Sequence, residues 1–177
     1  MSITRRETIA GALALAALPG TARAAGKVEI EAFDASGKSL GVAAVEKVVK
    51  TDAQWRAALS PIAYDVTRHE GTERAFTGPY WDAHEDGLFH CVGCDTALFD
   101  SKTKFDSGTG WPSFYAPIST HNVAESTDTA FGMRRVAVSC ARCDGHLGHV
   151  FTDGPKPTGL RYCMNGVALR FAPRKSA

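Results

Sequence analysis

Four of the five cysteines stand in two Cys-x-x-Cys units, and no other feature constrains the fold of this 177-residue chain as strongly. The units span residues 91–94 (CVGC) and 140–143 (CARC). Each unit places two thiolates on one tight turn, and two such turns facing each other supply the four sulfur ligands of a closed tetrahedral zinc site. The spacing therefore predicts one structural Zn²⁺, held by Cys91, Cys94, Cys140 and Cys143.

A pair of disulfides is the alternative, and an oxidising compartment would favour it. A bridge within one Cys-x-x-Cys unit is strained and reactive, however, so it makes a poor structural staple. A catalytic zinc is disfavoured because four thiolates leave no open coordination position. In this interpretation Gly93 and Gly145 supply the positive φ angles that such turns need.

The first 24 residues have the features of an export signal. Arg5 and Arg6 precede an uncharged apolar stretch over residues 9–18, and a small-residue site (ARA) follows at residues 22–24. As a helix this stretch would rise about 15 Å, half of a bilayer core of ~30 Å, so we expect no stable membrane insertion. The paired arginines resemble a twin-arginine signal, which implies export in a folded state to the bacterial periplasm. An amphipathic helix that stays attached is the alternative.

The charge of the chain argues against a nucleic-acid partner. Twenty Lys and Arg residues against 19 Asp and Glu leave a formal net charge of +1. This balance lacks the basic surplus that a phosphate-binding surface needs. We therefore expect neither DNA nor RNA among the partners.

Residues 25–50 are expected to form an N-terminal extension ahead of a main domain over residues 51–177. The extension alternates in character over residues 28–33 and is apolar over residues 41–49. This pattern predicts a hairpin or two short strands.

Two short helices are expected at the start of the main domain. Thr51 with Gln54 forms a capping-box pattern for the first helix. Ser60-Pro61 suits the start of a second helix, which Gly71 would end. After Gly71, glycines and prolines separate segments of only four to eight residues. This rhythm predicts a mainly β structure of antiparallel strands joined by shaped loops.

The fifth cysteine, Cys163, lies in a segment with the alternation of an extended strand. A period of two places Arg161, Cys163 and Asn165 on one face, opposite three apolar or aromatic side chains. The cation of Arg161 favours the thiolate, which is the nucleophilic form of cysteine. A buried inert cysteine is the alternative, but such a residue is expected among apolar neighbours. We therefore predict that Cys163 is a nucleophile.

His146 and His149 follow the second Cys-x-x-Cys unit and are predicted acid–base groups. Residues three apart on a regular strand point to opposite faces, so both imidazoles reach one site only if Gly148 interrupts the strand. We predict such a break. A structural role is the usual fate of a single histidine, and we accept it for His84 and His121. Two histidines beside a metal turn, in a chain with one unpaired thiol, favour acid–base catalysis.

Trp111 stands in a glycine-rich segment, residues 106–114 (DSGTGWPSF). The glycine-rich backbone around the Trp-Pro pair is expected to hold the indole in a fixed place, where it would form one wall of an apolar pocket. Packing in the core is the alternative.

Taken together, the segments FDSGTGWPSF and HLGHVFTDGPKPTGLRYCMN and the paired Cys-x-x-Cys units resemble the B-type methionine sulfoxide reductases, which reduce the R epimer of methionine S-oxide. The resemblance runs from about Trp55 to Phe171. It implies a compact, β-tent-like fold of twisted antiparallel sheets with short N-terminal helices and one structural zinc. It also implies peptide-methionine (R)-S-oxide reductase activity on oxidised proteins or peptides. The implied site has Cys163 as the catalytic cysteine and a substrate pocket formed by Trp111, His146, His149, Arg161 and Asn165.

The chemistry expected of these residue types starts at the sulfoxide oxygen, which His149, with His146, protonates or hydrogen-bonds directly or through a water. The Cys163 thiolate then attacks the sulfur while the methyl group rests against Trp111, and Cys163 is left as a sulfenic acid. Many family members carry a resolving cysteine where this sequence has Thr109. We therefore expect an external reductant, either a thioredoxin-like protein or a small thiol. Gly166 replaces a serine that is common in the family, with no consequence that the sequence reveals.

Two other function classes fit part of the sequence. A zinc-ribbon binding module accounts for four cysteines and nothing else. A cysteine hydrolase would use Cys163 as nucleophile and His149 as base, but the sequence identifies no Asp or Asn to orient the histidine.

Overall fold

The computed structural model describes residues 26–129 and 134–175. The segment predicted to be an export signal, residues 1–24, lies outside the described residues. In the described part of the chain, no helix combines the length and the apolar character needed to cross a membrane.

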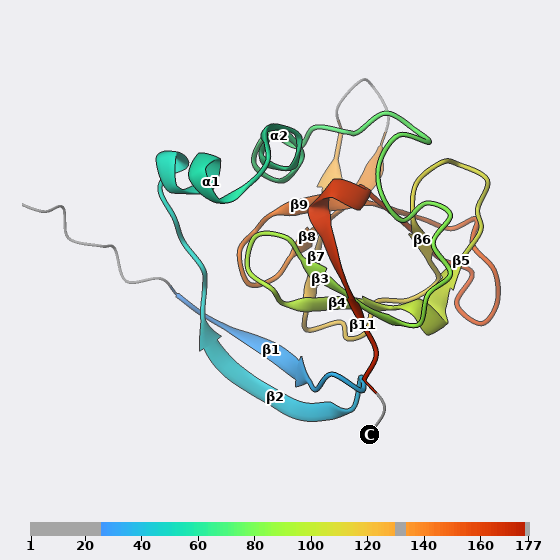
Figure 1. Cartoon of the computed structure of the whole chain (residues 1–177), viewed down its shortest axis with the longest axis horizontal. Coiled ribbons are helices and arrows are strands. Elements are labelled where there is room, and N and C mark those ends of the chain that lie inside the picture. The colour runs from blue at the N-terminus through green and yellow to red at the C-terminus, as the bar shows by residue number, and fades with distance from the viewer. Residues whose placement is uncertain (1–25, 130–133, 176–177) are drawn as a thin grey trace, which may run out of the picture.

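Strands dominate the described structure and form three antiparallel sheets (Figure 1). The smallest is a hairpin of β1 (Lys27–Phe33) and β2 (Ser39–Glu46). The largest has the order β5-β6-β10-β9-β8-β7, with β5 (Lys104–Phe105), β6 (Ser113–Phe114), β7 (Val123–Asp128), β8 (Arg135–Cys140), β9 (His146–Phe151) and β10 (Arg161–Met164). The third has the order β11-β3-β4, with β3 (Gly87–Cys91), β4 (Ala97–Asp100) and β11 (Leu169–Pro173). The prediction of a mainly β fold of antiparallel sheets is confirmed.

Aromatic side chains pack the two larger sheets together. Phe89 of β3, Phe99 of β4 and Phe114 of β6 are at most 1% exposed. The rings of Phe99 and Phe114 stack with their centroids 4.4 Å apart, and Phe89 meets Phe114 edge-on at 5.1 Å. Strands of two to six residues bury little surface singly, so these rings supply much of the apolar contact that joins the sheets.

Two short helices, α1 (Asp52–Ala58) and α2 (Pro61–His69), lie together along one side of the sheets (Figure 1). The capping box predicted for the first helix is present, since Thr51 and Gln54 exchange side-chain-to-backbone hydrogen bonds of 2.8 and 3.3 Å. The second helix also starts as predicted, but Gly71 does not provide its left-handed end. Glu70 takes that conformation, with φ 57°. Gly71 instead allows a close approach to Asp65, which a Cβ at residue 71 would prevent.

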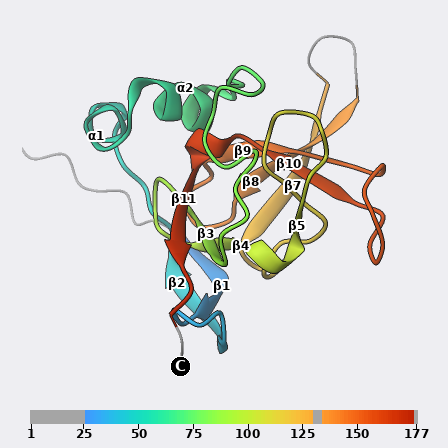
Figure 2. The ribbon, with the colours of Figure 1, turned by 45° about the vertical axis from the view of Figure 1, so that its right-hand side comes forward.

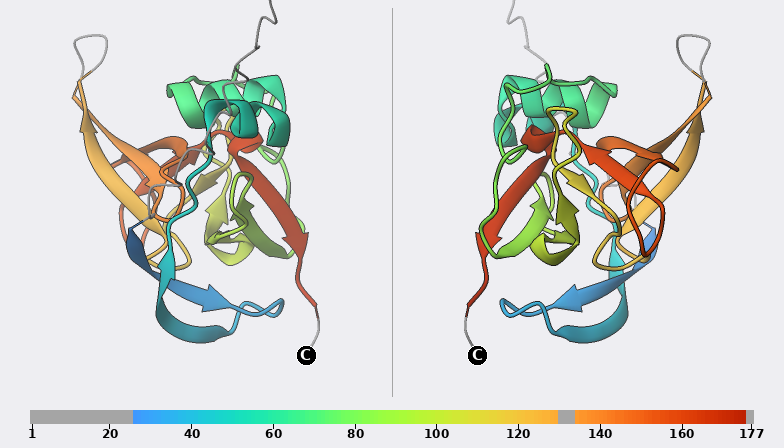
Figure 3. Two further views of the ribbon diagram at one scale, coloured as in Figure 1. Left: turned by 90° about the vertical axis from the view of Figure 1, so that its left-hand side faces the viewer. Right: turned by 90° about the vertical axis from the view of Figure 1, so that its right-hand side faces the viewer.

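The β1–β2 hairpin lies at the end of the molecule opposite the helices (Figures 1 and 3). The buried side-chain amide of Asn122 holds the hairpin there. The amide oxygen accepts the Glu31 N–H at 2.9 Å. The amide nitrogen donates to the Glu31 carbonyl at 2.9 Å and to the Ala97 carbonyl at 2.8 Å. A buried amide that satisfies three backbone groups fixes the position of a strand. Asn122 therefore attaches the first strand of the hairpin to the sheets, whereas β2 is largely exposed.

Candidate functional site

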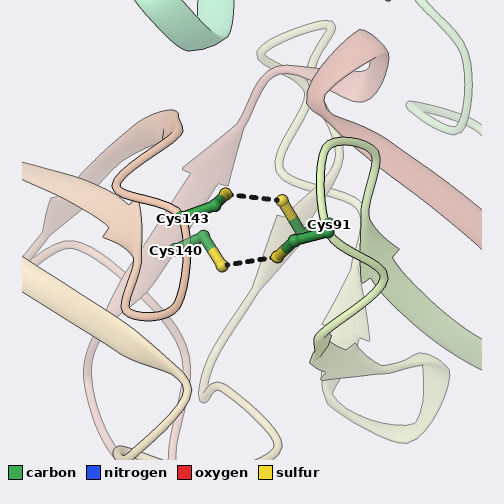
Figure 4. A group of neighbouring side chains, drawn as sticks. Cys91, Cys140 and Cys143 are labelled. Atoms are coloured by element: carbon green, nitrogen blue, oxygen red, sulfur yellow. Dashed lines mark hydrogen bonds between the residues drawn. The ribbon is translucent and has the colours of Figure 1, made fainter. Parts of the chain in front are cut away.

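Two turns, one from each of the larger sheets, bring four cysteines together. Cys91 and Cys94 belong to the turn between β3 and β4, and Cys140 and Cys143 to the turn between β8 and β9. All four sulfur atoms lie within 4.8 Å of one another, and Figure 4 shows the side chains of the two turns pointing toward each other. The S···S distances between the turns are 3.6 Å for Cys91 and Cys143 and 3.5 Å for Cys94 and Cys140.

These distances decide between metal ligands and disulfides. Four sulfurs about 2.3 Å from a central zinc lie about 3.8 Å from one another, whereas a disulfide requires about 2.05 Å. All five cysteines are free thiols in this structure. The four-cysteine cluster could therefore hold a metal ion, and a bound ion would tie the two larger sheets together.

The conformation of the two turns differs from the prediction in one respect. Gly93 and Gly145 do not take positive φ angles; Asp95 (φ 62°) and Asp144 (φ 56°) do. Each aspartate donates its N–H to the carbonyl of the first cysteine of its unit at 2.9 Å, which closes the turn. Aspartate tolerates this left-handed region better than most residues do. The glycines instead allow neighbouring side chains to pack closely against the turns.

A β-bulge in β9 brings the two predicted histidines together. Gly148 pairs with Val138 of β8, and the next pair is His146 with Ser139, so Leu147 is an extra residue without a partner. The predicted break is confirmed, and it lies at Leu147 and Gly148. The rings of His146 and His149 meet edge-on with their centroids 5.3 Å apart. A side chain at Gly148 would collide with the backbone of Cys163, so glycine is required there.

Strand β10 runs beside β9 in the largest sheet (Figure 2). Its register places Cys163 directly opposite His149 of β9 and Ser113 of β6. Tyr162 and Met164 are buried on the other face, as the alternation predicted. A hollow of about 170 Å³ has Cys163 in its wall. Its walls include four of the residues predicted for the site: Cys163, His149, Trp111 and Asn165.

Arg161 lies beside Cys163 but faces a different hollow. It donates two hydrogen bonds of 2.9 and 2.8 Å to Asp153, and its guanidinium stacks on the Phe151 ring at 4.4 Å. With Thr109, it borders a second hollow of about 410 Å³. Burial raises the pKa of the Cys163 thiol, whereas a hydrogen bond from Thr109 and the charge of Arg161 lower it. Arg161 thus acts in the predicted direction, but burial outweighs it.

Asp128 is a site residue that the sequence did not reveal. Its carboxylate is 2.8 Å from Nε2 of His149 and accepts a hydrogen bond of 2.6 Å from Arg135. The Asp128 and His149 side chains are only 16% and 13% exposed, so this pairing orients the imidazole and favours a proton on Nε2. The chain therefore has the orienting carboxylate that was not identifiable from sequence. In the structure Asp128 stands across the β7–β8 ladder from Arg135, and this register is not visible in the sequence.

His146 lies behind His149 and does not border the hollow over Cys163. It is 5% exposed, and its Nε2 has no hydrogen-bond partner among the described residues. Burial, reinforced by the charge of His149, lowers the pKa of His146 to about 4. His146 is therefore neutral near pH 7 and cannot act there as an imidazolium acid.

Glu73 is a second site residue that the sequence did not reveal, and it links three parts of the site. Its carboxylate accepts the N–H groups of Gly166 and Val167 at the start of the 3₁₀ helix η3 (Gly166–Ala168). Its backbone N–H donates to Asn165 at 2.9 Å, and its carbonyl accepts the Trp111 indole N–H at 3.1 Å. The residue is 2% exposed, and burial raises the pKa of its carboxyl while the two N–H groups lower it. Glu73 thus fixes Trp111 and Asn165 relative to the end of the Cys163 strand.

Replacing Glu73 with alanine is expected to lower the free energy of unfolding by about 2–4 kcal/mol, because two backbone donors that it satisfies would lose their partner. Chemical denaturation measures the change. Glu29→Ala is the matched control, since the Glu29 side chain is 71% exposed. Equal stability of the two variants would show that water replaces the carboxylate without cost.

Comparison with known proteins agrees with this geometry. The SelR domain model matches residues 59–173. Relatives described as peptide methionine sulfoxide reductase MsrB are 60% identical over 126 residues in Herminiimonas arsenicoxydans and 59% identical over 125 residues in Thiobacillus denitrificans. These alignments cover 71% of this chain, and 92% and 95% of the two relatives. A Pseudomonas putida relative with the same description is 58% identical over 133 residues, which are 75% of this chain and all of the relative.

The chain belongs to the MsrB family. The SelR match contains all four clustered cysteines and every residue described around Cys163, whereas the β1–β2 hairpin lies outside it.

The MsrB-like segment of this chain has glycine at residue 166, where a Cβ would collide with the Pro79 carbonyl oxygen. Glycine therefore lets the loop that carries Glu73 close tightly on η3.

Proposed function

We propose that the protein reduces the R epimer of methionine sulfoxide, in oxidised proteins or peptides, through the thiol of Cys163. The observation that carries this proposal is the hollow over Cys163, which combines a thiol, an imidazole and an indole around a space of about 170 Å³. The relatives named peptide methionine sulfoxide reductase support the substrate class.

In the proposed reaction the sulfoxide enters the hollow with its methyl group against Trp111. The Cys163 thiolate attacks the sulfoxide sulfur, and the S–O bond of the substrate breaks as the oxygen is transferred to Cys163. Methionine leaves, two electrons have passed from Cys163 to the substrate, and Cys163 is a sulfenic acid. The hydrogen bond between Trp111 and Glu73 supports the role of the indole, because it holds one wall of the hollow in place.

The proton that the sulfoxide oxygen needs is assigned to His149. This imidazole borders the hollow and stands opposite Cys163 on the neighbouring strand. Its Nε2–H is paired with Asp128, so the proton passes to the sulfoxide oxygen from Nδ1 of the doubly protonated ring, directly or through a water, and leaves His149 neutral. His146 then has a positioning role: it packs against His149 and remains neutral near pH 7.

The metal of the four-cysteine cluster is proposed to be zinc. Four thiolates at these separations suit Zn²⁺, which would supply structural stability and no chemistry, because the set leaves no open coordination position. With four thiols committed to a metal, Cys163 has no intramolecular partner. An external thiol attacks the sulfenic acid to form a mixed disulfide and water, and a second thiol releases Cys163 and a disulfide.

Stereospecific turnover tests the proposal. The purified, zinc-containing protein is incubated with dithiothreitol and separately with the R and S epimers of a blocked methionine sulfoxide. Loss of the R epimer alone is the expected result. Reduction of the S epimer, or of neither, would overturn the assignment.

The absence of a resolving thiol at residue 109 gives a further prediction. The Thr109 hydroxyl oxygen is 3.8 Å from the Cys163 sulfur, so Thr109→Cys should place a second thiol within bonding reach. After one turnover without reductant, mass spectrometry should show a disulfide between positions 109 and 163. The unaltered chain and Thr109→Ser should carry one added oxygen on Cys163 instead. An added oxygen that persists in Thr109→Cys would contradict the geometry.

Export to the periplasm is a separate part of the proposal and rests on the signal predicted for residues 1–24. It implies oxidised periplasmic proteins as substrates and a thioredoxin-like or small-thiol reductant in that compartment. The N-terminal sequence of the protein recovered from a periplasmic fraction tests it, and recovery of the full-length chain in the cytoplasm alone would reject it.

Hydrolysis is the second candidate function, because Asp128 supplies the orienting carboxylate that a Cys-His-Asp hydrolase needs. Cleavage of a p-nitrophenyl ester that is lost in Cys163→Ser would support it. We favour reduction because every similar protein named above is described as a reductase.

A further inference from the structure

Three hydroxyl groups form a connected group at the Cys163 sulfur. Thr109 Oγ1 is 3.8 Å from Cys163 Sγ. Ser107 Oγ is 2.8 Å from Thr109 Oγ1 and 2.7 Å from Ser113 Oγ. Ser113 pairs with Cys163 across the β6–β10 ladder, which places the two side chains next to each other on the same face of the sheet, and its hydroxyl lowers the pKa of the thiol.

This cluster of three hydroxyls lies between the protein interior and the second hollow. Ser113 is 0% exposed, whereas Ser107 and Thr109 border the hollow of about 410 Å³. The substrate hollow has none of the three hydroxyl residues in its walls. Thr109 therefore contacts the sulfur, and Ser107 links it to Ser113, without any of the three occupying the space assigned to the sulfoxide.

The geometry accommodates both protonation states of the sulfur. When the sulfur carries a proton, each group can donate to the next: Cys163 to Thr109, Thr109 to Ser107, and Ser107 to Ser113. Ser113 then donates to the Trp111 carbonyl at 3.2 Å. With a thiolate, the hydroxyls of Thr109 and Ser113 both turn to donate to the sulfur, and Ser107 donates to one of them. Hydroxyl hydrogens rotate freely, so the change requires no movement of heavy atoms.

We propose that Thr109 and Ser113, joined by Ser107, are hydrogen-bond donors that stabilise the Cys163 thiolate for attack on the sulfoxide. The proposal rests on the proposed reductase function only for its catalytic meaning; the donor role itself concerns the free thiol. Burial disfavours a thiolate at this position, and the hydroxyls offset that effect together with Arg161. Thr109 is then a catalytic residue, because it contacts the reacting sulfur.

The test measures the alkylation rate of Cys163 by iodoacetamide against pH in the zinc-containing protein, with the modified peptide quantified by mass spectrometry. Thr109→Val keeps the shape of the side chain and removes the hydroxyl. Its rate at pH 7.5 should fall about 3- to 10-fold, with the midpoint of the pH profile moved upward by about half to one unit. Thr109→Ser should keep the midpoint of the unaltered protein, and Ser107→Ala should give a smaller upward shift.

The charged and titratable groups around the sulfur stay the same in all these variants. They are Arg161 on its own strand, His149 on β9, Arg135 on β8 in the wall of the same hollow, and the carboxylates of Asp153 and Asp128. Thr120→Val, at an exposed position, controls for the substitution itself. An unchanged midpoint in both Thr109→Val and Ser107→Ala would overturn the proposal. A shifted midpoint in a protein that reduces neither sulfoxide epimer would support the donor role and reject the reductase function.

Discussion

Cys163→Ser is expected to lower kcat/KM for methionine sulfoxide by at least about 10⁴-fold, because a serine hydroxyl is far less nucleophilic than a thiolate and cannot accept the oxygen as a sulfenic acid does. The loss should appear mainly in kcat, since Trp111, Asn165 and His149 remain in place around the hollow. Single-turnover measurements with saturating substrate separate this effect from weaker binding.

The variant should otherwise resemble the unaltered protein. Cys163 is outside the four-cysteine cluster, so metal content and thermal stability should be preserved. Residual reduction within about 10-fold of the unaltered rate would exclude Cys163 as the nucleophile. A parallel loss of metal would show instead that Cys163 belongs to the metal site.

Cys143→Ser is the matched variant with the opposite expected outcome. Cys143 is 3% exposed and faces Cys91 across the two turns. Structural zinc contributes on the order of 10 kcal/mol to the free energy of unfolding of small zinc-dependent folds. In a domain of this size, a loss of 1 kcal/mol lowers the Tm by about 2–4 °C. Loss of a ligand should therefore lower the Tm by about 20 °C or more, or abolish a cooperative transition.

Each of the two variants removes a single thiol. Measuring metal content and Tm for both therefore separates the thiol that is expected to stabilise the fold from the thiol that is expected to react. The metal should be near one per chain in Cys163→Ser and strongly reduced in Cys143→Ser. A strong chelator should lower the Tm of the unaltered protein by a similar amount. A metal-free protein that melts at the same temperature would show that sheet packing alone holds the two turns together.

Much of the local structure could be predicted from short segments. The caps at Thr51 and Ser60 depend on residues within one turn, and both helices begin where the sequence predicts. The alternation around Cys163 depends on the pleat of a single strand. The break at Gly148 follows from the need to bring two histidines to one site, and the bulge is present.

The errors are local as well. The positive φ angles of the cysteine turns belong to Asp95 and Asp144, because the residue that closes each turn, and not the glycine near it, must take the left-handed conformation. Arg161 shares a strand face with Cys163 yet borders a different hollow, because Asp153 and the Phe151 ring draw its long side chain to one side.

The sequence by itself determined which residues are candidates for the chemistry: four cysteines spaced for a metal, a fifth cysteine outside that set, and the histidines and tryptophan expected beside it. Only the tertiary structure decided which partners set their properties. Asp128 reaches His149, Glu73 reaches Gly166, and Thr109 reaches Cys163 across 21, 93 and 54 positions of the chain, respectively. Hydrogen bonds of this span depend on the register between strands and on loops that fold back over them, and a side-chain period within one segment holds no information about either.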